Sequence, residues 1–269
     1  MVFADLDLAR RLERAEGSTC RDFAEARHRL SPASGATWIE CDGAYAVFDG
    51  VGSPLTQSFG LGLFEPLRTA ALDKLENFFL MRGAEVVHEV SPLAGVPAIQ
   101  MLCQRGYEPI ELSSVLWQSI DPSSTNPTDG IKVRVAQREE ADLWARISAG
   151  GWAPEQPELR DFMEPLGKVM AHCDHCVCFL AEVNGEPGAA GALHLQHGIA
   201  LLAGASTLPE MRRGGLQAAL LEARLQYGLA HACDLAMMVT ETGSQSQRNA
   251  ERKGFRIAYT RTKWRLPRS

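Results

Sequence analysis

Two spacings of apolar residues alternate along the chain and predict an alternation of strands and helices. Short apolar runs that end at turn pairs such as Asp42-Gly43 predict strands, whereas apolar residues three or four positions apart predict helices. In the first half these patterns predict helices over residues 6–14, 21–30, 66–81 and 95–105, and strands over 37–40, 44–48, 56–63, 85–90 and 108–117. We therefore expect an α/β fold built on a mixed sheet.

The order of elements starts again after a polar segment, residues 121–130, whose proline and serine content is typical of a linker. The second half has the same kinds of pattern. They predict strands over 131–135, 176–183, 189–196, 199–205, 235–240 and 255–264, and helices over 138–148, 158–171, 218–230 and 246–253.

The two halves can be superimposed as an internal repeat. A shift of 148 residues places Ala70-Ala71-Leu72 on Ala218-Ala219-Leu220, and the same shift places Arg105-Gly106-Tyr107 on Lys253-Gly254-Phe255. Two matches at one shift indicate duplication of a structural unit. We therefore expect two domains, residues 1–120 and 131–269, joined by the linker.

Composition limits the classes of partner. The chain has 269 residues, 45% of them hydrophobic, and a formal net charge of −6, which argues against nucleic acid as a partner. No apolar run approaches the roughly 18 residues that would span a membrane. Seven scattered cysteines, an odd number, suggest reduced thiols. Together with an acidic start that does not resemble a secretory signal, this leads us to expect a cytoplasmic protein.

The segment 209–221 carries the clearest chemical signal in the sequence. Arg212, Arg213, Gly214 and Gly215 lie between a predicted strand and a predicted helix. Backbone N–H groups at the start of a helix have no partner within the helix, and the helix dipole favours negative charge there. Glycine lets an anion approach the backbone, and arginine adds positive charge. The segment therefore predicts a site for a phosphorylated ligand.

The repeat provides an internal comparison for this segment. Residues 212–217 superimpose on 64–69, where no glycine occurs and Glu65 would repel a phosphate. We therefore expect the anion site in the second half only.

The second half resembles the GCN5-related N-acetyltransferases. That family carries an Arg/Gln-x-x-Gly-x-Gly/Ala turn between its fourth strand and third helix, and here the turn reads Arg212-x-x-Gly215-x-Gln217. Pro209-Glu210 before it and Lys253-Gly254-Phe255 near the end are also typical of the family. Gln217 departs from the small residue that the family has at this position.

The resemblance implies two tandem acyl-CoA N-acyltransferase folds, of which the first is degenerate and the second binds acetyl-CoA. It implies that the pantetheine arm contacts the end of the predicted strand and that the diphosphate contacts the turn. The residues assigned in this way are Ala205, Ser206, Thr207, Arg212, Arg213, Gly214, Gly215, Leu216, Gln217 and Ala218.

Two residues that the family often uses for cofactor contact and thiolate protonation are replaced here by Gly243 and Ala250. Ser244, Ser246 and Asn249 are polar substitutes nearby, and the sequence leaves open which of them faces the cofactor.

The general base is also not in its usual place. The family often has a glutamate on its fourth strand, where this chain has about Leu201. Glu241, at the end of a predicted strand, is the first substitute, and His197, whose ordinary pKa lies near neutrality, is the second.

The acceptor is expected to be a small-molecule amine. Family members cover the acceptor site with their first two helices, and the polar and aromatic residues in that region are Trp152, Glu155, Asp161 and Glu164. The segment 172–178 contains histidine, cysteine and aspartate, but its ligand types are crowded into one short stretch, so no metal site is expected. A tandem chain can imitate a dimer, so we expect a monomer. Two alternatives stay open: a non-catalytic acyl-CoA sensor, and an enzyme that uses a longer acyl donor.

Overall fold

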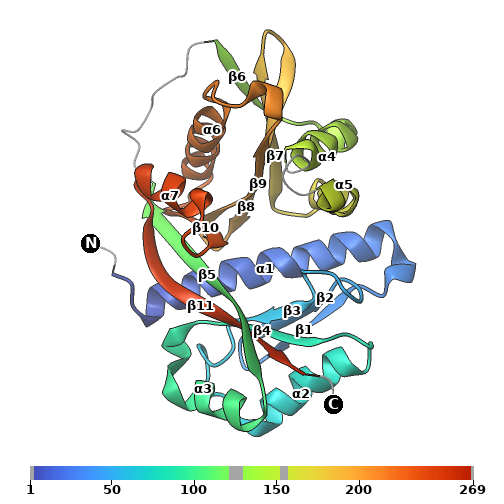
Figure 1. Ribbon diagram of the computed structural model, residues 1–269, viewed down its shortest axis with the longest axis vertical. Coiled ribbons are helices and arrows are strands. Elements are labelled where there is room, and N and C mark those ends of the chain that lie inside the picture. The colour runs from blue at the N-terminus through green and yellow to red at the C-terminus, as the bar shows by residue number, and fades with distance from the viewer. Residues whose placement is uncertain (1–2, 121–129, 152–156, 268–269) are drawn as a thin grey trace. The chain divides into compact units, whose positions relative to one another are not determined.

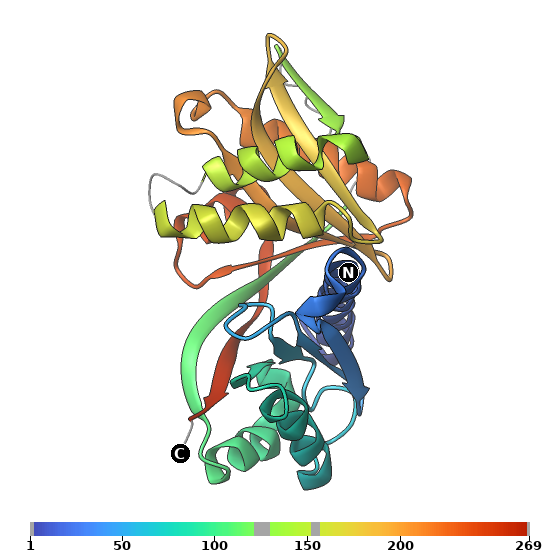
Figure 2. The same cartoon turned by 90° about the vertical axis from the view of Figure 1, so that its right-hand side faces the viewer.

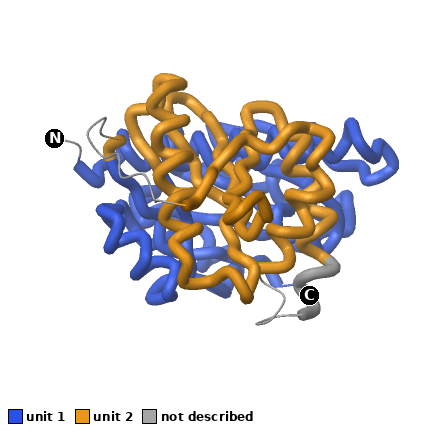
Figure 3. Tube along the Cα trace, turned by 90° about the horizontal axis from the view of Figure 1, so that it is seen from above, with its two compact units in different colours: residues 1–118, 237–269 blue, residues 119–236 orange. Residues whose placement is uncertain are grey.

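The computed structural model describes residues 3–120, 130–151 and 157–267. Two compact units are present, and they do not coincide with the two halves of the chain (Figure 3). Unit 1 contains residues 1–118 together with 237–269, and unit 2 contains residues 119–236. No helix among the described residues combines the length and the apolar character that crossing a membrane requires.

Among the described residues, the first half of the chain forms three α-helices and five strands, whereas the sequence pattern predicts four helices and five strands. The helices are α1 (Leu6–Leu30), α2 (Thr69–Leu80) and α3 (Gly95–Gln104), and the strands are β1 (Thr37–Cys41), β2 (Ala44–Phe48), β3 (Gln57–Phe59), β4 (Val86–Val90) and β5 (Glu108–Ser119).

The second half repeats the alternation with six strands and four helices. The strands are β6 (Ile131–Val135), β7 (Cys176–Val183), β8 (Glu186–Gln196), β9 (Ile199–Thr207), β10 (Leu235–Glu241) and β11 (Arg256–Leu266). The helices are α4 (Ala141–Gly150), α5 (Pro157–Met170), α6 (Leu216–Ala230) and α7 (Gln245–Arg252).

The last strand of the chain belongs to unit 1. The strands of that unit follow the order β1-β2-β3-β4-β11-β5-β10, where β10 contributes its residues from Met237 onward, so β11 lies between two strands of the first half (Figure 1). It pairs antiparallel with both, with Trp264 opposite His88 of β4 and Thr262 opposite Leu112 of β5. The predicted domains, 1–120 and 131–269, are the two copies of the sequence repeat. The compact units divide the chain differently, because unit 1 combines residues from both ends of the chain. The predicted linker falls, except for Gly130, outside the described residues.

Strand β2 is buried on both faces of the sheet, and the alternation of its side chains shows why. Ala46 and Phe48 point to a core that includes Leu72 and Phe79 of α2. Val47 points to the opposite face, where it joins a cluster with Ala24 of α1. Because helices cover both faces, all five residues of β2 are buried.

The prediction of two helices at 6–14 and 21–30 is wrong, because α1 is one continuous helix of 25 residues. Glycine in a helix interior is unfavourable by roughly 1 kcal/mol relative to alanine, and Gly17 lies in the segment between the two predicted helices. In the structure, Gly17 lies against the ring of Tyr45, so a Cβ at this position would clash with that side chain. Close packing of α1 on β2 explains the glycine.

The repeat is visible in matching turns. In the first half, Gly106 has a φ of 85° and the N–H of Tyr107 donates to the carbonyl of Leu102 (3.0 Å). In the second half, Gly254 has a φ of 93° and the N–H of Phe255 donates to the carbonyl of Ala250 (3.1 Å). The left-handed backbone that glycine favours therefore ends α3 and α7 in the same way.

Unit 2 has an antiparallel sheet with helices on both faces. Its strands follow the order β9-β8-β7-β6. Helices α4 and α5 lie beside each other on one face and α6 lies on the other (Figures 1 and 2). Trp144 of α4 is fully buried against the sheet and donates its indole N–H to the carbonyl of Phe179 (3.1 Å).

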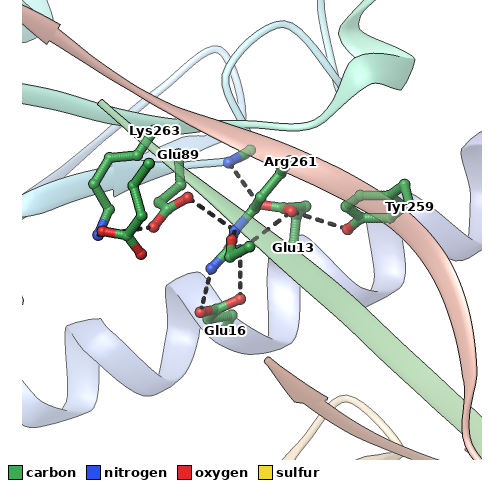
Figure 4. Close-up of polar contacts among 9 residues, drawn as sticks. Glu13, Glu16, Glu89, Tyr259, Arg261 and Lys263 are labelled. Carbon is green, nitrogen blue, oxygen red and sulfur yellow. Dashed lines mark hydrogen bonds and ion pairs between the residues drawn. The ribbon is translucent and has the colours of Figure 1, made fainter. Parts of the chain in front are cut away.

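A buried cluster of charges attaches β11 to the rest of unit 1 (Figure 4). The side chain of Arg261 is 2% exposed and forms ion pairs with Glu13 (3.3 Å), Glu16 (2.6 Å) and Glu89 (3.0 Å). The two glutamates of α1 and the one of β4 therefore meet one guanidinium from the last strand. Because removal of the arginine would leave the carboxylates buried without it, the cluster favours this placement of β11.

Glu13 is the most deeply buried carboxyl group of the cluster. Its oxygens accept hydrogen bonds from the hydroxyl of Tyr259 (2.9 Å) and from the backbone N–H of Gly60 (3.3 Å). Burial, only partly offset by Arg261, raises the pKa of Glu13 from its ordinary value of 4.5 to about 7.

This shift predicts a pH-dependent contribution to stability. Between pH 4.5 and 7 the unfolded chain has lost the Glu13 proton that the folded chain still holds. The contribution is therefore present in full below pH 4.5 and falls as the pH rises to 7, by roughly 3 kcal/mol in total. Glu13→Gln, which does not titrate, should lack this component.

Urea denaturation of both proteins at several pH values checks this. We expect the free energy of unfolding of the wild type, relative to that of Glu13→Gln, to fall steadily from pH 4.5 to 7. A difference that stays constant over this range would show that Glu13 is ionised in the folded protein throughout.

Candidate functional site

The end of β9 is held against the end of α4 by two small residues. A Cβ on Gly150 would contact the side chain of Leu208, and a Cβ on Gly151 would overlap the side chain of Ser206. The hydroxyl of Ser206 donates to the carbonyl of Ser148 (2.7 Å). The paired glycines thus let α4 approach the backbone at the point where β9 ends.

The chain then makes a tight turn into α6. The N–H of Leu208 donates to the carbonyl of Gly188 (2.9 Å), and the N–H of Met211 donates to the carbonyl of Leu208 (2.9 Å). Gly188 has no room for a Cβ because Met211 packs on it. The turn is therefore anchored to the neighbouring strand β8.

Left-handed backbone closes the turn. Arg213 has a φ of 66° and Gly215, the residue that precedes α6, has a φ of 86°. The left-handed residues come immediately before a 15-residue helix, whose first N–H groups have no partner within the helix. The first bond of the helix is donated by Ala219 to the carbonyl of Gly215 (3.1 Å), and within the described chain the N–H groups of residues 213–218 have no hydrogen-bond partner. Unpaired N–H groups at a helix start form a site for an anion.

The side chains of Arg212 and Gln217, both assigned to this turn from the sequence, make different contacts. Arg212 donates from its guanidinium to the carbonyls of Gly151 (2.7 Å) and Thr207 (3.4 Å), so it holds the turn on α4 and β9. Gln217, the departure from the family pattern, donates its amide N–H to the hydroxyl of Thr207 (2.8 Å). Both contacts leave the backbone N–H groups exposed to a ligand.

The matching place in the first half is built differently. Arg68, the residue before α2, has an extended backbone and forms a two-armed ion pair with Asp42 (2.7 Å). Shortly after β3, the N–H of Gly60 donates to the carboxylate of Glu13. In this region of unit 1, a backbone N–H therefore already donates to a carboxylate of the protein itself, and the arginine before the helix already has an acidic partner.

The structure reveals a bulge that we did not predict. Ala190 pairs with Ser206 and Ala192 pairs with Ala203, so Gly204 and Ala205 of β9 together face the single residue Gly191 of β8. Gly204 has a φ of 57°. An isolated glycine within a strand pattern is the signal that could have indicated it. The bulge turns Ala205, an assigned cofactor residue, out of the regular ladder.

Three of the remaining assigned polar residues, Glu241, Ser244 and Asn249, lie in unit 1. The hydroxyl of Ser244 accepts the N–H of Gln247 (3.1 Å) and so begins α7. The amide oxygen of Asn249 accepts a bond from Gln245 (2.8 Å). Glu241 is exposed at the carboxyl end of β10. Because these three residues belong to unit 1, only the strand end, the turn and the start of α6 are brought together in unit 2.

His197 lies at the other end of β9 from the turn. It is exposed in the turn between β8 and β9, with a φ of 52°. Nine residues of strand separate it from Leu208, a length of roughly 30 Å at 3.3 Å per residue. The structure therefore does not bring His197 to the predicted anion site.

Two further groups of residues come from the sequence analysis: the residues expected near the acceptor, and the segment 172–178 with its histidine, cysteine and aspartate. Trp152, Glu155 and the side chain of Asp161 fall outside the described residues, and Glu164 lies 3.8 Å from Lys168 on α5. In the described part of the chain no group of three histidine, cysteine or acidic side chains is arranged to hold a metal ion.

The fold of the chain resembles that of known structures. A protein described as a GCN5-related N-acetyltransferase from Kribbella flavida superimposes with a TM-score of 0.63 at 19% identity, over 91% of this chain and 95% of that one. A protein described as a GCN5-related N-acetyltransferase from Sphaerobacter thermophilus superimposes with a TM-score of 0.53 at 16% identity, over 82% of this chain and 76% of that one. A tandem GNAT protein from the clavulanic acid biosynthesis pathway superimposes with a TM-score of 0.59 at 14% identity, over 84% of this chain and 79% of that one.

No protein-family model and no curated protein matches the sequence. The similarity is therefore one of three-dimensional structure, and it extends over both halves of the chain. The chain has a tandem GCN5-related N-acetyltransferase fold.

Proposed function

We propose that this protein is an acetyl-CoA-dependent N-acetyltransferase whose acceptor is a small-molecule amine. The observation that carries the proposal is the start of α6, where the backbone N–H groups of residues 213–218 have no hydrogen-bond partner within the described chain and follow a left-handed turn. Such a turn fits the diphosphate of CoA because it offers several backbone donors. The fold of the chain supports the same proposal.

Direct transfer requires both reactants to be bound at once. The amine nitrogen attacks the thioester carbonyl carbon, a C–N bond forms, the C–S bond breaks, and the amine proton passes to a base. Holding the reactants in line supplies much of the acceleration. In this chain the bulge at Gly204 and Ala205 releases backbone from the ladder near the end of β9, where N–H groups suit a developing oxyanion.

An acetyl-CoA assay with a panel of amines tests the activity. We expect thiol release above the background rate with at least one amine, together with a product that is heavier by one acetyl group in mass spectrometry. A net charge of −6 favours cationic amines in the panel. Tight binding of CoA without thiol release for any amine would instead support a sensor, and stronger competition by longer acyl-CoAs would support a different donor.

Gly215→Asp tests where the cofactor binds. The change places a carboxylate at the residue that precedes α6, beside the N–H groups that have no partner within the described chain. Charge repulsion should weaken CoA binding at least tenfold, or about 1.4 kcal/mol. Isothermal titration calorimetry measures this directly.

Gly83→Asp is the matched control. Gly83 also has a positive φ, 66°, and open space where a Cβ would lie, but it belongs to unit 1. We expect its CoA affinity to equal that of the wild type. Equal affinity of both variants and the wild type would show that the diphosphate does not bind at this turn.

Glu241 is the base that we propose. Its carboxylate is exposed at the end of β10 and forms no ion pair within the described chain. General bases contribute roughly 100-fold or more to rates, so Glu241→Gln should lower kcat by about 100-fold and leave CoA affinity unchanged. Steady-state kinetics with the acetylated amine checks this, and Glu210→Gln, an exposed carboxylate beside the turn, is the control. An unchanged kcat in Glu241→Gln would remove this residue from the mechanism.

A further inference from the structure

A buried arginine lies behind the bulge in β9. Arg224, in the middle of α6, is 3% exposed, and its guanidinium points to the sheet of unit 2. Its Nε donates to the carbonyl of Leu220 (3.1 Å), and its Nη1 donates to the carbonyls of Ala192 (3.1 Å) and Ala203 (3.4 Å). These bonds hold it between a helix and two strands.

No carboxylate neutralises this charge. Among the described residues Arg224 contacts only backbone carbonyls, and burial alone lowers its pKa, to about 10. The guanidinium therefore keeps its proton at neutral pH. Burial of an unpaired charge is costly, so a hydrophobic residue at this position would be the simpler way to fill the core.

The carbonyls that Arg224 contacts flank the bulge on both strands. Ala192 and Ala203 are the last regular pair before the ladder is interrupted by Gly191 on one side and by Gly204 and Ala205 on the other. A Cβ on Gly191 would lie 3.1 Å from the Cζ atom of Arg224, so glycine provides the space that the guanidinium fills. The arginine and the bulge thus fit each other.

One contact of Arg224 and one of Ser148 act on peptide groups of the bulge. The carbonyl of Ala203 and the N–H of Gly204 belong to one peptide, so the bond from Arg224 polarises that N–H. From α4, on the opposite face, the hydroxyl of Ser148 donates to the carbonyl of Gly204 (3.3 Å) and polarises the N–H of Ala205 in the same way. Two successive N–H groups are therefore strengthened as donors.

We infer that Arg224 is a positioning residue for acyl transfer, which holds the bulge of β9 and makes its N–H groups stronger donors to the thioester carbonyl of the acyl-CoA. The inference rests on the proposed function. In this role the positively charged side chain of Arg224 lies behind the strand, does not contact the substrate, and acts through the backbone donors of the site. Ser148 assists it from the other face of the sheet.

Infrared spectroscopy of bound acetyl-CoA, labelled with carbon-13 at the carbonyl, tests the inference without turnover. Stronger donors lower the carbonyl stretching frequency. We expect a lower frequency in the wild type than in Arg224→Met, with Arg224→Lys in between because it keeps the charge. In the amine assay, kcat of Arg224→Met should fall about tenfold, while the Kd of CoA changes less than twofold.

Two further variants keep the test decisive if Arg224→Met does not fold. Gly191→Ala pushes the guanidinium away, and Ser148→Ala removes the other donor, so both should raise the carbonyl frequency. Arg146→Met, which removes an exposed arginine of α4, is the control and should match the wild type.

The outcomes separate this inference from the proposed function. Bound acetyl-CoA with the same carbonyl frequency in the wild type and in the folded variants would overturn the role of Arg224 alone. Bound acetyl-CoA with the expected shifts but no acetylated amine would overturn the proposed function alone. Failure of acetyl-CoA to bind the wild type would overturn both.

Discussion

The fold of unit 1 depends on a single guanidinium, that of Arg261, which is buried among three carboxylates. Glu13 and Glu16 come from the first helix and Glu89 from β4, so the ion pairs join the two ends of a 269-residue chain. Ion pairs in a protein interior compensate for their desolvation only if every member is present. The last strand therefore has one favourable position, between β4 and β5, and the first half is complete only when the C-terminal strand is in place.

The two halves use related backbones for different purposes. In unit 2 the turn before α6 leaves a row of N–H groups available, and the arginine beside it holds the turn through backbone carbonyls. In unit 1 the arginine before α2 is paired with Asp42, and a carboxylate of α1 takes the N–H of Gly60. The turn before α6 therefore keeps N–H groups that have no partner within the described chain, whereas in the corresponding region of unit 1 one backbone donor and the arginine already have acidic partners.

Much of the local structure could be predicted because it depends on short-range patterns. The positions of α2, α3, β7 and β11 agree with the predictions within a few residues, and the paired glycine turns at Gly106 and Gly254 follow from the repeat. The break expected near Gly17 is the exception, since the reason for that glycine is contact with Tyr45, 28 positions later in the chain. A pattern within one helix contains no information about such a contact.

The sequence by itself determined the α/β alternation, the duplication, and the turn from Arg212 to Gly215, because periodicity, spacing and left-handed backbone are properties of neighbouring residues. Tertiary structure alone decided the place of β11, the bulge at Gly204, and the setting of Arg224. Strand order and buried charge both depend on which distant groups meet, and the sequence shows an arginine in a helix without showing whether it faces water or carbonyls. The physical reason is that the energy of a buried charge is set by its surroundings.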